Sequence, residues 1–63
     1  MNSELKEGIL LKAQKLELEY EMLCSYQDDF RHVGIKSEVE KIENEKNVLL
    51  EKILKLKQLY EWI

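Results

Sequence analysis

The sequence predicts an all-α fold: two long helices form an antiparallel hairpin with coiled-coil-like packing, and the hairpin dimerises into a four-helix bundle. Three observations support this prediction. The 63 residues contain no proline and only two glycines, so little interrupts a helix. Apolar residues recur in steps of three and four along both halves of the chain, which is helical spacing. Signals that end one helix and begin another occur together near the middle, so residues 1–63 are expected to form one helical-hairpin domain.

The first helix is expected over residues 3–33. Its apolar stripe has nearly regular spacing and comprises Leu5, Ile9, Ala13, Leu16, Tyr20, Leu23, Tyr26 and Phe30. Arg31 and the histidine after it favour a helix end at this point, because cations interact well with the negative end of a helix dipole. Asp28 and Asp29 have the opposite effect, so an end near Gln27 is the alternative.

A turn is expected at residues 34–37. Gly34 suits the left-handed conformation that commonly follows a helix, because it has no Cβ atom to clash with the backbone. Three residues later, Ser37 and Glu40 have the spacing of a capping box, in which each side chain accepts a hydrogen bond from the other residue's backbone N–H. The second helix is therefore expected over residues 38–63.

The second helix has a strict seven-residue repeat. The repeat comprises Val39, Ile42, Lys46, Leu49, Ile53, Leu56, Tyr60 and Ile63. Such a repeat is typical of helices that pack along a left-handed supercoiled seam. We interpret Lys46, the charged residue in this repeat, as a register-setting polar position, so Lys46→Leu is expected to raise thermal stability and to loosen the specified assembly. The alternative, which we favour, is that its stem packs in the seam while its ammonium group extends to solvent, where Glu43 or Glu45 pairs with it.

Apolar residues outside the two stripes exceed what one hairpin can bury. A hairpin covers about one face of each helix, and a large apolar side chain left in water forgoes about 1.5–3 kcal/mol. The surplus predicts a second packing layer, either another copy of the chain or a different helical protein. The candidate dimer or partner surface comprises Leu11, Leu18, Leu54, Leu59 and Trp62. The alternative for Trp62 is that it caps the end of the hairpin against Leu5 or Ile9.

The distribution of charge favours a particular arrangement of two copies. Residues 16–45, nearest the turn, contain nine acidic and three basic residues, whereas the remainder contains four acidic and seven basic residues. Two hairpins packed head to tail would place each acidic turn end beside a basic open end. The sequence therefore predicts an antiparallel homodimer, with a solvated charged face as the alternative.

Few residues are suited to catalysis or to ligand binding. His32 is the single histidine and Cys24 the single cysteine, and neither has a second such residue at metal-ligand spacing. We expect His32 to be an exposed helix-end residue and Cys24 a partly buried small apolar residue. The two glycines form no phosphate-binding loop. The sequence predicts no metal, no cofactor and no enzymatic activity.

The predicted function is a non-catalytic protein–protein interaction module, namely a regulator, adaptor or co-chaperone that acts through helix packing. The alternative is a nucleic-acid-binding helical bundle that uses Lys41, Lys52 and Lys55, although the net charge of −3 argues against a polyanionic partner. The longest apolar run in the first 15 residues, at 9–11, is too short for a signal peptide or a membrane span. A cytoplasmic location without membrane association is therefore expected.

Overall fold

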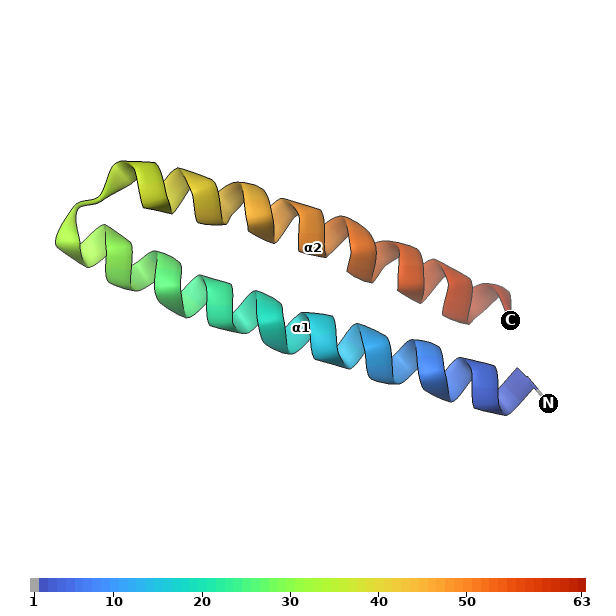
Figure 1. The fold of residues 1–63 in the computed structure, drawn as a ribbon. Coiled ribbons are helices and arrows are strands. Elements are labelled where there is room, and N and C mark those ends of the chain that lie inside the picture. The colour runs from blue at the N-terminus through green and yellow to red at the C-terminus, as the bar shows by residue number, and fades with distance from the viewer. Residues whose placement is uncertain (1) are drawn as a thin grey trace.

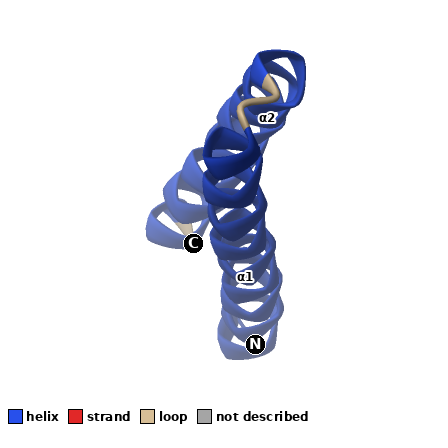
Figure 2. Cartoon of the chain, turned by 90° about the vertical axis from the view of Figure 1, so that its left-hand side faces the viewer, coloured by secondary structure: helices blue, strands red, loops and turns tan. Residues whose placement is uncertain are grey.

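The computed structural model describes residues 2–63, and Met1, the first residue of the predicted domain, lies outside them. Two helices, α1 (Asn2–Val33) and α2 (Lys36–Trp62), run antiparallel and pack against each other (Figure 1). They cross rather than lie strictly parallel, as the view turned by 90° shows (Figure 2). The Cα radius of gyration is 14.7 Å, against about 10.6 Å for a globular domain of this length. The predicted all-helical hairpin is confirmed, and it is a rod with Cα dimensions of 50 × 14 × 10 Å.

α1 ends in a Schellman motif around Gly34. This glycine has φ of +85°, and its N–H donates to the carbonyl oxygens of Phe30 at 2.9 Å and of Arg31 at 3.1 Å. The N–H of Ile35 donates to the carbonyl oxygen of Phe30 at 3.0 Å. These bonds satisfy carbonyl groups at the helix end that would otherwise lack partners. The prediction for Gly34 is confirmed, and the alternative end near Gln27 is wrong.

The predicted capping box is also wrong. α2 begins at Lys36, its N-cap residue is Ile35, and no side chain makes a capping hydrogen bond. The chain enters the helix directly from the Schellman motif, so Ser37 already has helical backbone geometry and cannot serve as the N-cap. The turn is therefore shorter than the predicted 34–37. The carbonyl oxygen of Ile35 accepts the first hydrogen bond of the helix, from the N–H of Val39 at 3.2 Å.

The seam of α2 largely follows the predicted repeat. Its buried and half-buried members are Val39, Ile42, Lys46, Leu49, Ile53, Leu56 and Ile63. Tyr60 is more exposed than predicted, because its ring lies at the open end of the hairpin. The ammonium nitrogen of Lys6 lies 5.2 Å from the centre of this ring. At that distance the cation and the aromatic face attract each other.

The seam of α1 differs from the prediction at two positions. Leu5 and Tyr26 are 54% and 50% exposed, and Lys6 and Gln27 occupy the seam in their place. With these two polar residues the spacing becomes strictly three and four, through Lys6, Ile9, Ala13, Leu16, Tyr20, Leu23, Gln27 and Phe30. One residue along a helix is a rotation of about 100°, so a neighbouring apolar residue cannot replace a polar one in the seam.

The two helices pair in a single register. Lys6 lies opposite Tyr60, and fourteen residues further along α1, Tyr20 lies opposite Lys46, fourteen residues back along α2. Seven further residues place Gln27 opposite Val39. Equal steps in opposite directions are what an antiparallel pair of seven-residue repeats requires. Within residues 2–63, neither helix has a segment long and apolar enough to cross a membrane.

Candidate functional site

A polar cluster occupies the helix interface near the turn. Gln27 is only 2% exposed, and its side-chain amide makes all three side-chain hydrogen bonds of the cluster. Its Nε2 donates to the carbonyl oxygen of Val39 at 3.1 Å and to Oε2 of Glu43 at 2.7 Å. Its Oε1 accepts from Nζ of Lys46 at 2.9 Å. The amide of α1 therefore joins a carboxylate and an ammonium group of α2.

The ammonium group of Lys46 turns into the interface. The Lys46 side chain is only 14% exposed, and its Nζ lies 3.7 Å from Oε2 of Glu43. The same nitrogen lies 5.3 Å from the centre of the Tyr20 ring. The alternative in which this group extends to solvent is therefore wrong, although Glu43 is one of the two carboxylates expected to pair with it. The other, Glu45, borders a groove described below.

The cluster changes the proton affinity of two groups. The hydrogen bond from Gln27 and the charge of Lys46 hold the pKa of Glu43 below its usual value of 4.5, although desolvation opposes them. Burial by itself would lower the pKa of Lys46. Its interactions with Cys24, Tyr20 and Glu43 outweigh burial and raise this pKa above its usual value of 10.5. Both shifts favour the charged forms, so the ion pair persists at neutral pH.

The buried polar atoms of the cluster are satisfied within the chain. Among the described residues, every buried side-chain nitrogen and oxygen atom has a hydrogen-bond partner. The same residues contain no group of three histidine, cysteine or acidic side chains arranged to hold a metal ion. Cys24 is a half-buried free thiol, and His32 is exposed, as expected for both. The cluster therefore links the two helices to each other.

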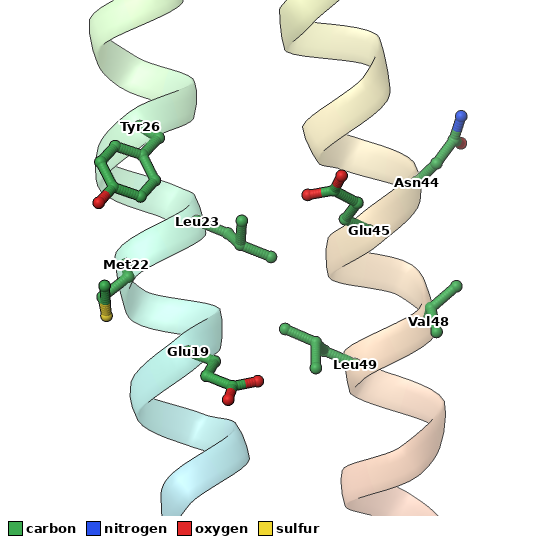
Figure 3. Close-up of a pocket in the computed structure, with 8 residues that line it drawn as sticks. All are labelled: Glu19, Met22, Leu23, Tyr26, Asn44, Glu45, Val48 and Leu49. Atoms are coloured by element: carbon green, nitrogen blue, oxygen red, sulfur yellow. The ribbon is translucent and has the colours of Figure 1, made fainter.

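An apolar groove of about 550 Å³ lies beside the cluster, along one side of the hairpin. Figure 3 shows Leu23 and Leu49 pointing toward each other across the space between the helices. Met22 and Tyr26 flank the groove on α1, and Val48 flanks it on α2. The remaining lining residues are Glu19, Asn44 and Glu45. The groove thus combines an apolar floor with carboxylates at its edge.

In two helices that pack through seven-residue repeats, residues seven apart lie on the same face of each helix. The residues that line the groove therefore belong to a face that runs along the whole hairpin. Steps of seven from Met22 and Tyr26 along α1, and from Glu45 and Val48 along α2, define it. We call it the groove face. Its charged and large apolar members are Leu5, Lys12, Lys15, Glu19, Met22, Tyr26, Asp29 and Val33 of α1 and Glu38, Lys41, Glu45, Val48, Lys52, Lys55, Leu59 and Trp62 of α2.

The five residues predicted to contact a partner are all exposed, but they do not share one face. Leu59 and Trp62 belong to the groove face. Leu11 and Leu18 lie on the outer surface of α1, and Leu54 lies on the side of α2 away from the groove. Trp62 is 89% exposed, so the alternative in which it caps the hairpin against Leu5 or Ile9 is wrong.

Sequence reasoning missed the groove residues Met22, Tyr26 and Val48 as a group. The predicted seam contains Tyr26, whereas the seam of the structure contains its neighbour Gln27. The signal that identifies it is the seven-residue rhythm of α1, which passes through Gln27 and leaves Tyr26 on the flank. Comparisons of the chain with protein-family models, with curated proteins and with solved structures return no match.

Proposed function

We propose that this chain is a small non-catalytic protein–protein interaction module, a regulator, adaptor or co-chaperone of the cytoplasm, that acts through helix packing. In this proposal a second copy packs antiparallel on the hairpin and completes a four-helix bundle. The observation that carries the proposal is the apolar groove between α1 and α2. Its floor and flanks consist of leucine, methionine, tyrosine and valine side chains, as in grooves that receive a partner helix.

The surface area of the hairpin supports a partner of about its own size. The described chain has an accessible surface of 5248 Å². A compact monomer of this mass exposes about 4,300 Å². The excess is close to the roughly 800 Å² that each partner buries in a stable protein interface of standard size. One further hairpin is therefore enough to bring the exposed area into the ordinary range.

Sedimentation equilibrium of the purified chain, with circular dichroism of the same samples, tests the proposal. We expect a strongly helical dimer at concentrations of about 1 to 100 μM, the range in which an interface of modest size is populated. A helical monomer throughout this range would contradict self-association. A monomer with little helix would contradict the independent hairpin and require a different protein to complete the fold.

One observation favours a second candidate function, the binding of nucleic acid. Lys12, Lys15, Lys52 and Lys55 lie together on the open half of the groove face. They form a local basic surface in spite of the net charge of −3. A salt titration of RNA or DNA binding tests this candidate, because phosphate contacts weaken steeply as salt is added. The absence of binding at low salt would exclude it.

A further inference from the structure

We infer that the groove face is the surface on which the second copy packs, with a twofold axis near the middle of the hairpin. This inference rests on the proposed function, because it assigns the face and the geometry of the proposed homodimer. It follows from three features of the described residues: the charges along the groove face, the apolar side chains among them, and the charges on the opposite side.

The open half of the groove face is basic. It contains four lysines, Lys12 and Lys15 on α1 and Lys52 and Lys55 on α2, and no acidic residue. All four side chains belong to exposed residues, and none forms an ion pair within the described chain. This half therefore presents unpaired positive charge to any surface placed against it.

The turn half of the same face is acidic. It contains four acidic residues and one lysine, namely Glu19, Asp29, Glu38, Glu45 and Lys41. Glu19 and Glu45 are exposed and line the apolar groove, and both side chains point into the space between the helices (Figure 3). One face thus contains two halves of opposite charge, which is the pattern that an isologous twofold contact can use.

A twofold axis that crosses the rod at its middle, so that the second copy runs in the opposite direction, brings these charges together. The midpoints of α1 and α2 lie close to residues 17 and 49. Glu19 and Lys15 are each two residues from the α1 midpoint, on opposite sides, and Lys52 and Glu45 are three and four residues from the α2 midpoint. Rotation about the axis therefore places the carboxylates of one copy against the lysines of the other. The four charges nearest the axis are all complementary.

The same rotation covers the apolar groove. Val48 lies beside the axis, and the lysine stems of the second copy lie over Met22, where their methylene groups pack while the ammonium groups reach the carboxylates. Leu59 of the second copy lies at the level of Tyr26. Each copy therefore contributes Tyr26 at one end of the interface and Leu59 at the other, and the charged residues lie near its centre.

The opposite side of the hairpin lacks this complementarity. It is the side of the ion pair in which Nζ of Lys57 lies 3.2 Å from Oε1 of Glu17. Its open half contains Glu7 and Glu61 besides Lys57. Its turn half is also acidic on balance, with Glu21, Asp28, Glu40 and Glu43 against Arg31 and Lys36. The same twofold on this side would bring acidic halves together, which repel.

Paired charge-reversal variants test the inference. In E19K/E45K the net charge of the turn half changes from −3 to +1, and in K15E/K52E the net charge of the open half changes from +4 to 0. At the positions nearest the axis each variant alone places like charges against each other, so we expect each homodimer to weaken at least about tenfold in dissociation constant. An equimolar mixture restores opposite charges at the four positions nearest the axis. We expect the heterodimer to return to within about threefold of the wild-type dissociation constant, with circular dichroism confirming that each variant remains helical.

The matched control is E21K/E61K, which changes the net charge by the same amount on the opposite side. We expect it to leave the wild-type dissociation constant within about threefold. A wild-type dimer that is unaffected by E19K/E45K, or strengthened by E21K/E61K, would overturn the inference while leaving the proposed function intact. A wild-type monomer would instead contradict the proposed function. Emission of Trp62, the single tryptophan, gives a second readout: it should shift to shorter wavelength on dimerisation of the wild type.

Discussion

Nζ of Lys46 lies 2.9 Å from Oε1 of Gln27, so the charged seam residue of one helix is held by a buried amide of the other. The same amide donates through Nε2 to Glu43 and to the carbonyl oxygen of Val39. A side-chain amide can accept and donate at once, and it can therefore bridge a cation and an anion. Because these bonds join α1 to α2 at one level, a slip of either helix would break all of them.

Leucine substitutions in this cluster should be strongly non-additive. K46L alone removes the donor to a buried oxygen of Gln27, and Q27L alone removes the acceptor of Lys46. Each is expected to destabilise the protein by about 1–3 kcal/mol, because an unpaired polar group stays buried. The double variant Q27L/K46L leaves no such group in the seam and should be neutral or more stable. Urea unfolding followed by circular dichroism, at one protein concentration, measures the four free energies.

This expectation replaces the sequence-based one that K46L alone raises thermal stability. That expectation considered Lys46 among apolar neighbours, whereas the structure places Gln27 beside it. A K46L variant with a higher free energy of unfolding than the wild type would show that the hydrogen bond to Gln27 contributes little.

Acid should weaken the cluster through Glu43. The folded-state pKa of this carboxyl group lies below its usual value of 4.5, so its stabilising contribution is present above pH 4.5 and is lost as the pH falls through the folded-state value. A carboxyl ¹³C NMR titration should give a midpoint for Glu43 below 4.5. In Q27L the largest cause of the shift is absent, and the midpoint should rise. An equal midpoint in both proteins would contradict the role of the Gln27 hydrogen bond.

The two glycines should respond to alanine in opposite directions. Gly34 has φ of +85°, where a Cβ atom is strained, so G34A should destabilise the protein by about 1–2 kcal/mol. Gly8 lies within α1, where G8A should stabilise it by about 0.5–1 kcal/mol. A Cβ atom at either position meets nothing within 4 Å, so crowding does not enter the comparison. Thermal unfolding of both variants provides the measurement, and destabilisation by G8A would contradict the assignment.

The ion pair between Glu17 and Lys57 should contribute little. Its atoms lie 3.2 Å apart, but both side chains are about half exposed, so water and salt screen their attraction. A double-mutant cycle with E17Q and K57M should give a coupling of about 0.2–1 kcal/mol, which decreases as salt is added. A coupling well above this range would mean that the side chains are less solvated than the structure indicates.

Most of α2 could be predicted from its sequence, because at all but one of its seam positions the residue is apolar, from Val39 to Ile63. In such a helix the regularly spaced hydrophobic residues are also the residues of the seam. In α1 they diverge twice. Lys6 and Gln27 occupy the seam beside more apolar neighbours. A prediction that takes the most apolar residue of each turn therefore places Leu5 and Tyr26 in the seam instead.

Local signals at the turn were correct only in part. Gly34 ends α1 because the backbone requirement for positive φ is local to that residue. Ser37 has the spacing of an N-cap, but an N-cap residue must itself have non-helical φ and ψ. The Schellman motif leads directly from Ile35 into α2, so Ser37 already lies inside the helix. The structure of the preceding turn, which the serine spacing does not reflect, decided where α2 begins.

The sequence by itself determined that this chain forms two long helices joined at Gly34. The spacing of apolar residues, the lack of helix-breaking residues and a glycine that adopts positive φ each depend only on residues close together in the chain. Tertiary structure alone decided which side chains of the two helices contact each other. The partnership of Gln27 with Lys46, the exclusion of Tyr26 from the seam and the joining of Met22, Tyr26 and Val48 into one groove all depend on the register of α1 against α2. Register is a relation between residues far apart in the chain, so each helix's sequence contains only half of the information.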